Sequence, residues 1–131
     1  MKMSPRDVVM RFFDDLRKGD ADSAFSCLAP DVDYRVKAPS PYGGTMNAEG
    51  LICLARRIFS KLEEPINISV QRIISEGDTV VVEAQGNART TRGGNYDNDY
   101  LFVFRVVGEK IVDAHEYLDA MKLFDLMEDR R

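Results

Sequence analysis

The sequence has few cysteines, a single histidine and no excess of basic residues, and each shortage excludes a class of protein. Two cysteines, Cys27 and Cys53, among 131 residues are too few for a disulfide framework and fit a reduced cytoplasm better. The 18 basic residues are outnumbered by 22 acidic ones, and the net charge of −4 argues against binding to nucleic-acid phosphates. One histidine with scattered carboxylates is a poor set of metal ligands, so we expect no metal and no other cofactor.

Long apolar segments are also missing. No apolar run approaches the ~20 residues that a membrane helix needs, and residues 1–7 carry charge without the apolar stretch of a signal peptide. With 131 residues, 44% of them hydrophobic, the chain is long enough for one core and near the usual size of one domain. We therefore expect residues 1–131 to form a single soluble, cytoplasmic domain with no membrane or nucleic-acid partner.

Helical periodicity is present in three segments of the first half and in the tail. Residues 4–19 begin with Ser4 and Pro5, which suit a helix N-terminus, and end at a glycine. A shorter helix is predicted from residue 20 or 22 up to the break at Pro30. Further apolar stripes predict a third helix over residues 51–62 and one or two helical turns over residues 120–127.

The second half alternates apolar and polar residues, as half-buried strands do. Short glycine turns separate these segments, so we expect an antiparallel meander over residues 66–70, 79–90, 99–107 and 111–119. An earlier strand is predicted over residues 32–37, and the turn-rich segment 38–45 is predicted to be a loop. Three helices followed by a curved antiparallel sheet predict an α+β fold in which the helices cover one sheet face.

The predicted strand at 79–90 has small residues on its apolar face. Val80 and Val82 are followed on that face by Ala84, Gly86 and Ala88. Two interpretations stay open. Small residues mark close packing or a bend, or they leave an unfilled pocket at that end of the sheet.

The last predicted strand carries polar groups with a period of two. His115, Tyr117 and Asp119 share one face if the strand is regular. On an inward face these groups would be costly without partners or a function. The alternatives are a partly hydrated face with ordinary hydrogen bonds, or a bulge that brings in the other face, which carries Ala114, Glu116 and Leu118.

The strand at 99–107 is apolar on both faces, so its inward face is left open. One face carries Tyr100, Phe102, Phe104 and Val106, and the other carries Leu101, Val103 and Val107. Either Phe102 or its neighbour Val103 is expected to line the pocket.

Four stretches together resemble a known family: residues 28–32, residues 40–45, residues 96–105 with 108–111, and residues 116–119. With the order of elements, they make the chain similar to the SnoaL-like group of the nuclear transport factor 2-like superfamily. That group contains polyketide cyclases and relatives of ketosteroid isomerase and limonene epoxide hydrolase. The resemblance implies a cone-shaped curved sheet with three N-terminal helices enclosing a pocket.

The resemblance also implies roles for single residues. Asp119 occupies the place of the aspartate that serves as an acid/base group in SnoaL-like cyclases. The arginine and aspartate of the epoxide hydrolases fall on Ala84 and Gly86, which disfavours epoxide hydrolysis. Ketosteroid isomerases place a carboxylate base on the first strand, where this chain has Tyr34 inward and Asp33 on the other face.

Two functional hypotheses follow. The first is an isomerase-like or cyclase-like enzyme for a small, largely apolar carbonyl compound, with Asp119 as acid/base, His115 orienting it or polarising the substrate, and Tyr34 or Tyr117 donating a hydrogen bond. The pocket would also be lined by Ala84, Gly86 and Phe102. The second is a non-catalytic module that binds a small apolar ligand or serves as a dimerisation platform. In either case we expect a homodimer.

Overall fold

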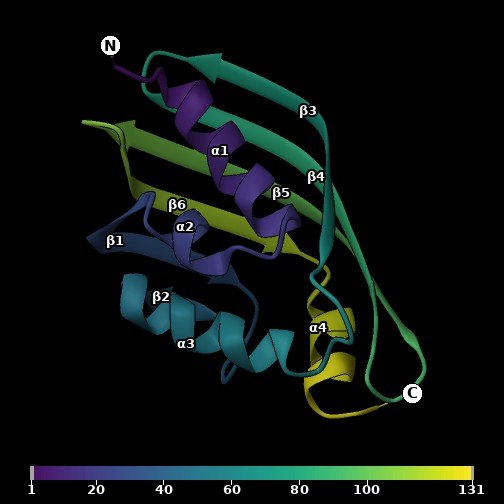
Figure 1. Ribbon diagram of the computed structural model, residues 1–131. Coiled ribbons are helices and arrows are strands. Elements are labelled where there is room, and N and C mark those ends of the chain that lie inside the picture. The colour runs from purple at the N-terminus through teal and green to yellow at the C-terminus, as the bar shows by residue number, and fades with distance from the viewer. Residues whose placement is uncertain (1, 131) are drawn as a thin grey trace.

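The computed structural model describes residues 2–130, which fold into one sheet with helices on its inner face (Figure 1). The first half contains three helices and two strands: α1 (Pro5–Arg17), α2 (Ala21–Phe25), β1 (Leu28–Lys37), β2 (Gly44–Met46) and α3 (Ala48–Phe59). The second half supplies the long strands and a last helix: β3 (Asn67–Glu76), β4 (Thr79–Arg89), β5 (Asn95–Val107), β6 (Lys110–Leu118) and α4 (Ala120–Met127). The α+β fold predicted from the sequence is confirmed.

The sheet has six strands in the order β2-β1-β6-β5-β4-β3 among the described residues, and it is curved and unclosed. Strands β3 to β6 form the antiparallel meander that the glycine turns predict. Strand β1 pairs with β6 in parallel, so the sheet is mixed rather than wholly antiparallel. The short β2, which pairs with β1, lies at the end of the segment that was predicted to be a loop.

The helices form where side-chain caps and apolar stripes predict them. The Ser4 hydroxyl accepts a hydrogen bond from the Asp7 N–H at 3.1 Å, and Asp20 and Asn47 cap α2 and α3 in the same way. The third helix starts earlier than predicted and ends at Phe59. Pro30, which was predicted to stop a helix, lies within β1.

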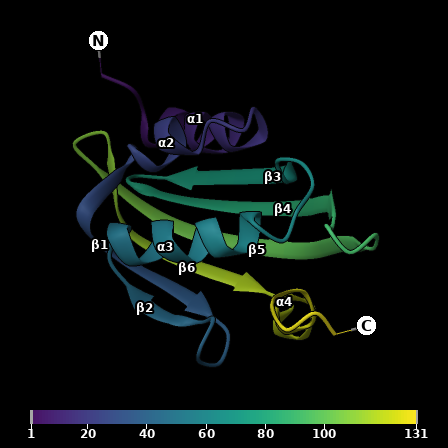
Figure 2. The same ribbon diagram turned by 60° about the horizontal axis from the view of Figure 1, so that its bottom comes forward.

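Aromatic rings fill the space between α1 and the sheet. Phe13 meets Phe102 with ring centroids 5.0 Å apart, and Phe12 meets Phe104 at 5.9 Å. Along β5 the rings of Tyr100, Phe102 and Phe104 stack in a row. In Figure 2, α3 lies in front of the sheet and α4 lies where β6 ends.

A bulge in β6 sets which residues point inward. Arg105 pairs with Asp113, but the next residue of β5, Val106, pairs with Ile111, so β6 carries one extra residue at this point. Ile111 is buried before the bulge and Ala114 after it, which means that the inward face changes from odd to even numbers. The face carrying Ala114, Glu116 and Leu118 therefore points inward, and the regular phase that would place His115 there is wrong.

Within residues 2–130 no helix is both long enough and apolar enough to cross a membrane.

Candidate active site

The interior contains a small cavity between the sheet, α1 and α3. Its volume is about 90 Å³. The walls are mainly apolar, and α3 supplies Leu51, Leu54, Ala55, Ile58 and Phe59. The polar groups that line it are one carboxyl, from Glu116, and three phenols, from Tyr34, Tyr96 and Tyr100. An apolar pocket with a few convergent polar groups is the usual form of a small-molecule site.

Glu116 and Tyr34 meet because their strands run side by side. In the parallel pairing of β1 with β6, Glu116 is opposite Val36 and Tyr34 is two residues earlier on the same face. The Tyr34 hydroxyl donates a hydrogen bond of 2.6 Å to Oε1 of Glu116. Burial raises the pKa of Glu116 to about 7, although the bond from Tyr34 lowers it. Near neutral pH this carboxyl is present in both protonated and ionised forms.

A second cluster of polar side chains lies along β5, the strand that pairs with β6 on the side opposite β1. Tyr96, Asn98 and Tyr100 alternate on the inner face of the strand, and Asn98 is the buried polar residue of the described chain. Its amide donates a hydrogen bond of 2.9 Å to the Tyr96 hydroxyl, which lies 3.1 Å from the Tyr100 hydroxyl. Burial raises the pKa of Tyr34, Tyr96 and Tyr100, so these phenols stay protonated at neutral pH.

Of the seven residues predicted for the site, two line the cavity. Tyr34 is 2% exposed and Phe102 is 3% exposed, and both belong to its walls. The structure also decides the face of β5, because Phe102 points inward and Val103 outward.

Ala84 and Gly86 point inward but do not line the cavity. A Cβ atom added at Gly86 would lie 3.0 Å from both the Ile66 side chain and the Tyr100 ring. The absence of a side chain at Gly86 thus makes room for the side chains of Ile66 and Tyr100 and not for a ligand. Of the two interpretations of this strand, close packing is the one that the structure supports.

His115 and Tyr117 lie on the outer face, as the bulge requires. The His115 Nε2 atom is 3.5 Å from the Asp113 carboxylate, and the Tyr117 ring is 43% exposed beneath the Lys37 ammonium. Neither side chain reaches the cavity, so the expectation that both would line the pocket is wrong.

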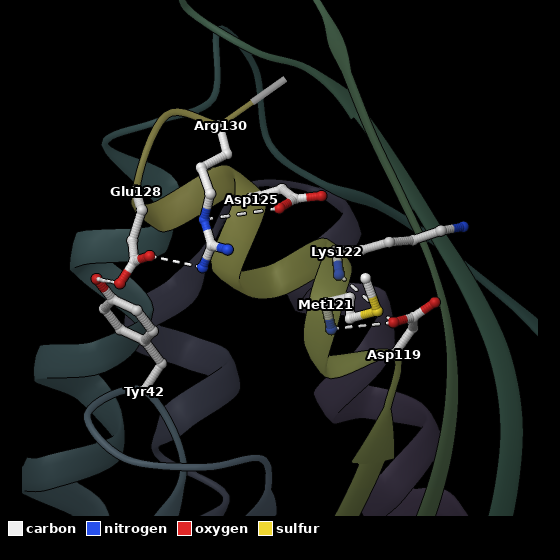
Figure 3. Close-up of polar contacts among 7 residues, drawn as sticks. All are labelled: Tyr42, Asp119, Met121, Lys122, Asp125, Glu128 and Arg130. Atoms are coloured by element: carbon white, nitrogen blue, oxygen red, sulfur yellow. Dashed lines mark hydrogen bonds and ion pairs between the residues drawn. The ribbon is translucent and has the colours of Figure 1, made fainter.

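Asp119 also points away from the cavity, because it begins α4. Its Oδ1 accepts hydrogen bonds from the N–H groups of Met121 at 3.0 Å and Lys122 at 3.4 Å (Figure 3). These are the bonds of a helix N-cap, and they satisfy donors that the helix itself cannot. The expectation of an inward-facing carboxyl at this position is wrong, and the geometry gives Asp119 a structural role.

The residues missed as site candidates are Glu116, Tyr96 and Tyr100. Glu116 follows Ala114 with a period of two, and Tyr96 and Tyr100 share the phase of Phe102 and Phe104. A signal was therefore present in the pattern of β5. The position of the bulge in β6 had no signal of its own.

A larger hollow of about 470 Å³ lies outside the cavity, between α4 and the turn that joins β4 to β5. Tyr96 lines both spaces and separates them. The rim is charged, but Lys61 pairs with Asp129 at 3.1 Å and Arg130 with Asp125 at 3.8 Å. These groups lie at a rim that is open to water, where water and salt weaken their interactions.

Comparison with known proteins places the chain in a family. The model of the SnoaL-like domain matches residues 9–114, and the chain therefore belongs to the SnoaL-like domain family. This confirms the resemblance found in the sequence. No curated protein matches the chain in sequence.

Solved structures confirm the nuclear transport factor 2-like fold. A Burkholderia pseudomallei NTF2-like protein of unknown function has a TM-score of 0.81 at 20% identity, covering 96% of this chain and 98% of that one. IdmH, a proposed polyketide cyclase from Streptomyces antibioticus, has a TM-score of 0.79 at 18% identity, covering 96% and 99%. A proposed isomerase from Rhodopseudomonas palustris has a TM-score of 0.75 at 10% identity, covering 99% of both. At these identities the likeness extends to the fold alone.

Proposed function

We propose that the protein is an enzyme of the isomerase or cyclase type that moves a proton on a small, largely apolar carbonyl compound. The observation that carries the proposal is the Glu116 carboxyl, which lines an apolar cavity and has its pKa raised to about 7. A general base works best when its pKa lies near the working pH. The family and the fold neighbours named as a cyclase and an isomerase support the reaction class.

In this proposal Glu116 takes a proton from the carbon next to the carbonyl group and returns it at another position. Tyr34 bonds one carboxyl oxygen, Oε1, which leaves Oε2 for the substrate. Breaking the C–H bond leaves its electron pair in an enolate, whose oxygen gains negative charge. Neither oxidant nor reductant is required, because only a proton moves.

The test is exchange of α-hydrogens for deuterium in D₂O, followed by proton NMR on acetone, cyclopentanone and cyclohexanone at pH 7. We expect catalysed exchange in the wild type and a loss of about 100-fold or more in Glu116→Gln, as for removal of a general base. Glu76→Gln changes an exposed glutamate on β3 and serves as the matched control. Exchange that equals the buffer rate, or that is equal in wild type and Glu116→Gln, would contradict the proposal.

A second candidate is a module that binds a small apolar ligand without catalysis. The observation in its favour is that the cavity is small, about 90 Å³, and that its walls are mainly apolar. Binding of these ketones without α-exchange would support this function over the enzymatic one.

We also propose a homodimer that is formed through the outer face of the sheet. Leu101 pairs with Tyr117 and Val81 with Val103, which places four apolar side chains side by side on that face. Leu101 is 37% exposed and Tyr117 is 43% exposed. Acidic and basic groups surround this apolar patch, so it suits a second copy of the same face: Asp33, Arg35, Glu83 and Arg105.

A further inference from the structure

Asn98 is held by hydrogen bonds that fix which way its amide points. The main-chain N–H of Asp119 donates to Asn98 Oδ1 at 2.9 Å. On the other side, Asn98 Nδ2 donates to the Asp119 carbonyl at 3.1 Å and to the Tyr96 hydroxyl at 2.9 Å. Because an N–H can only donate and a carbonyl can only accept, the flipped amide would lose these bonds with Asp119. The donor of Asn98 therefore faces Tyr96.

This orientation favours one direction for the next hydrogen bond. The Tyr96 oxygen accepts from Asn98, and its hydroxyl lies 3.1 Å from that of Tyr100, where either group can donate. Among the described residues Tyr100 is the acceptor within reach of the Tyr96 hydrogen, so a chain that runs in one direction has Tyr96 donating to Tyr100. The Tyr100 oxygen then accepts, and its own hydrogen is left to point elsewhere. Tyr100 lines the cavity, whereas the hydroxyl of Tyr34 is already bonded to Glu116. Tyr100 thus supplies the uncommitted hydroxyl hydrogen in the cavity.

We propose that Asn98 is a positioning residue that directs this chain of hydrogen bonds, from Asn98 to Tyr96 to Tyr100, so that Tyr100 donates to the carbonyl oxygen of a bound ketone. The inference rests on the proposed function, since it assigns the group that meets the oxygen while Glu116 takes the proton. Each bond in a chain with one direction polarises the next, so the Tyr100 hydroxyl becomes a stronger donor.

Asn98→Asp tests the direction of the chain. The new carboxylate still accepts from the Asp119 N–H, but it cannot donate to Tyr96. The Tyr96 hydrogen then turns toward position 98, Tyr100 donates to Tyr96, and an oxygen lone pair faces the cavity. Protonating the new carboxyl at acid pH restores a donor to Tyr96, which makes the effect depend on pH. Glu116 also takes up its proton between pH 8 and acid pH, so each variant is compared with the wild type at the same pH.

The readout is the ¹³C resonance of cyclopentanone that is labelled at its carbonyl carbon, because a hydrogen bond to the oxygen moves this resonance downfield. We expect the bound wild-type value to lie downfield of that in Tyr100→Phe. Asn98→Asp should resemble Tyr100→Phe at pH 8 and approach the wild type at acid pH. The dissociation constant should rise about threefold to tenfold in both variants at pH 8.

Two controls separate direction from structure. Asp119→Ala weakens the start of α4 but leaves Asn98, Tyr96 and Tyr100 in place, so the carbonyl resonance should stay as in the wild type. If Asn98→Asp does not fold, Tyr96→Phe replaces it, and we expect an intermediate resonance because Tyr100 loses its donor but keeps its hydrogen.

Equal carbonyl resonances in wild type and Tyr100→Phe would overturn the proposal, as would a folded Asn98→Asp with the wild-type resonance at pH 8. The two proposals fail in different ways. Exchange that depends on Glu116 without the resonance difference overturns the role of Asn98 alone. The resonance difference without exchange overturns the proposed reaction alone.

Discussion

Two opposing influences set the protonation state of Glu116. Burial removes water from the ionised carboxylate and raises its pKa, whereas the Tyr34 hydroxyl stabilises the carboxylate and lowers it. Burial is the larger influence, so the pKa is raised from 4.5 to about 7. The same carboxyl that is suited to proton transfer therefore reduces the stability of the fold when it ionises.

This shift predicts a pH dependence of stability. Below pH 4.5, folded and unfolded chains both hold the proton, and between pH 4.5 and about 7 only the folded chain does. The free energy of unfolding therefore falls as pH rises through this window, by about 3 kcal/mol. Urea unfolding of wild type and Glu116→Gln at pH 5 and pH 8 checks this.

The difference between the two proteins is the quantity to compare, because other groups also titrate. We expect Glu116→Gln to gain stability relative to the wild type at pH 8, and Glu76→Gln to follow the wild type. A constant difference between wild type and Glu116→Gln at the two pH values would show that burial does not control this carboxyl.

At the scale of elements, α4 is fixed at its start by Asp119 and at its far end by Tyr42. The Tyr42 ring packs edge-on against Phe124 at 4.9 Å and also lies beside Glu128 (Figure 3). Arg57 of α3 lies over the same Tyr42 ring at 5.5 Å. Tyr42, in the loop before β2, therefore contacts both α4 and α3.

The cap gives Asp119 a different mutational pattern from that of a catalytic residue. Asp119→Asn retains a side-chain oxygen that can cap, so we expect the wild-type rate of α-exchange and stability within about 0.5 kcal/mol. Asp119→Ala removes the cap and should cost about 1 kcal/mol. Urea unfolding measures the stability and the exchange assay measures the rate. If the Asp119→Asn protein folds but no longer catalyses α-exchange, Asp119 is an acid/base residue after all and this prediction is contradicted.

Gly86 in β4 predicts an effect on ligand binding through packing. In Gly86→Ala the new Cβ lies 3.0 Å from the Tyr100 ring, so we expect the ring to move, cyclopentanone affinity to fall about tenfold, and a stability loss of about 1–3 kcal/mol. Gly94→Ala is the control, since its Cβ would meet its nearest neighbour at an ordinary 3.5 Å. Isothermal titration with cyclopentanone measures the affinity. An unchanged affinity in Gly86→Ala would show that packing at Gly86 does not affect the ligand site.

Local patterns were sufficient to predict most elements but not the phase of β6. The cap at Ser4 and the glycine turns of the meander are interactions between near neighbours, and these were predicted, while the start of the second helix was predicted as residue 20 or 22 and is capped by Asp20. The parallel pairing of β1 with β6 joins residues far apart in sequence, and the bulge opposite Arg105 adds one residue to β6 within the β5–β6 hairpin, which the alternation of side chains does not reveal. The sequence pattern thus predicts Tyr34 and Phe102 as site residues. Because it gives no sign of the bulge, it places Glu116 on the alternative face and favours Asp119 as the acid/base residue.

At the scale of the whole molecule, the two faces of the sheet have different surroundings. The inner face carries the cavity beneath the helices, and no helix covers the outer face in Figures 1 and 2. Leu101 and Tyr117 remain exposed on that outer face. A second copy would cover them without reaching Glu116.

The homodimer predicts a mass in solution of about twice the 14.8 kDa of one chain. Leu101→Glu places a charge in the apolar patch and should reduce the mass to that of one chain, because two like charges would meet across a symmetric interface. Light scattering after size exclusion measures both proteins, with Glu76→Gln as a control outside the patch. A wild-type mass of one chain would contradict the dimer.

The proposed site depends on the Glu116 carboxyl, which changes its protonation state near neutral pH inside the cavity. A ¹³C NMR titration of its side-chain carboxyl tests this directly, in the wild type and in Tyr34→Phe. The predicted midpoint is about 7 in the wild type, and it should rise by about one pH unit in Tyr34→Phe, which loses the bond that stabilises the carboxylate. A midpoint near the ordinary 4.5, unchanged by Tyr34→Phe, would mean that Glu116 is hydrated like a surface residue and would contradict the proposed site.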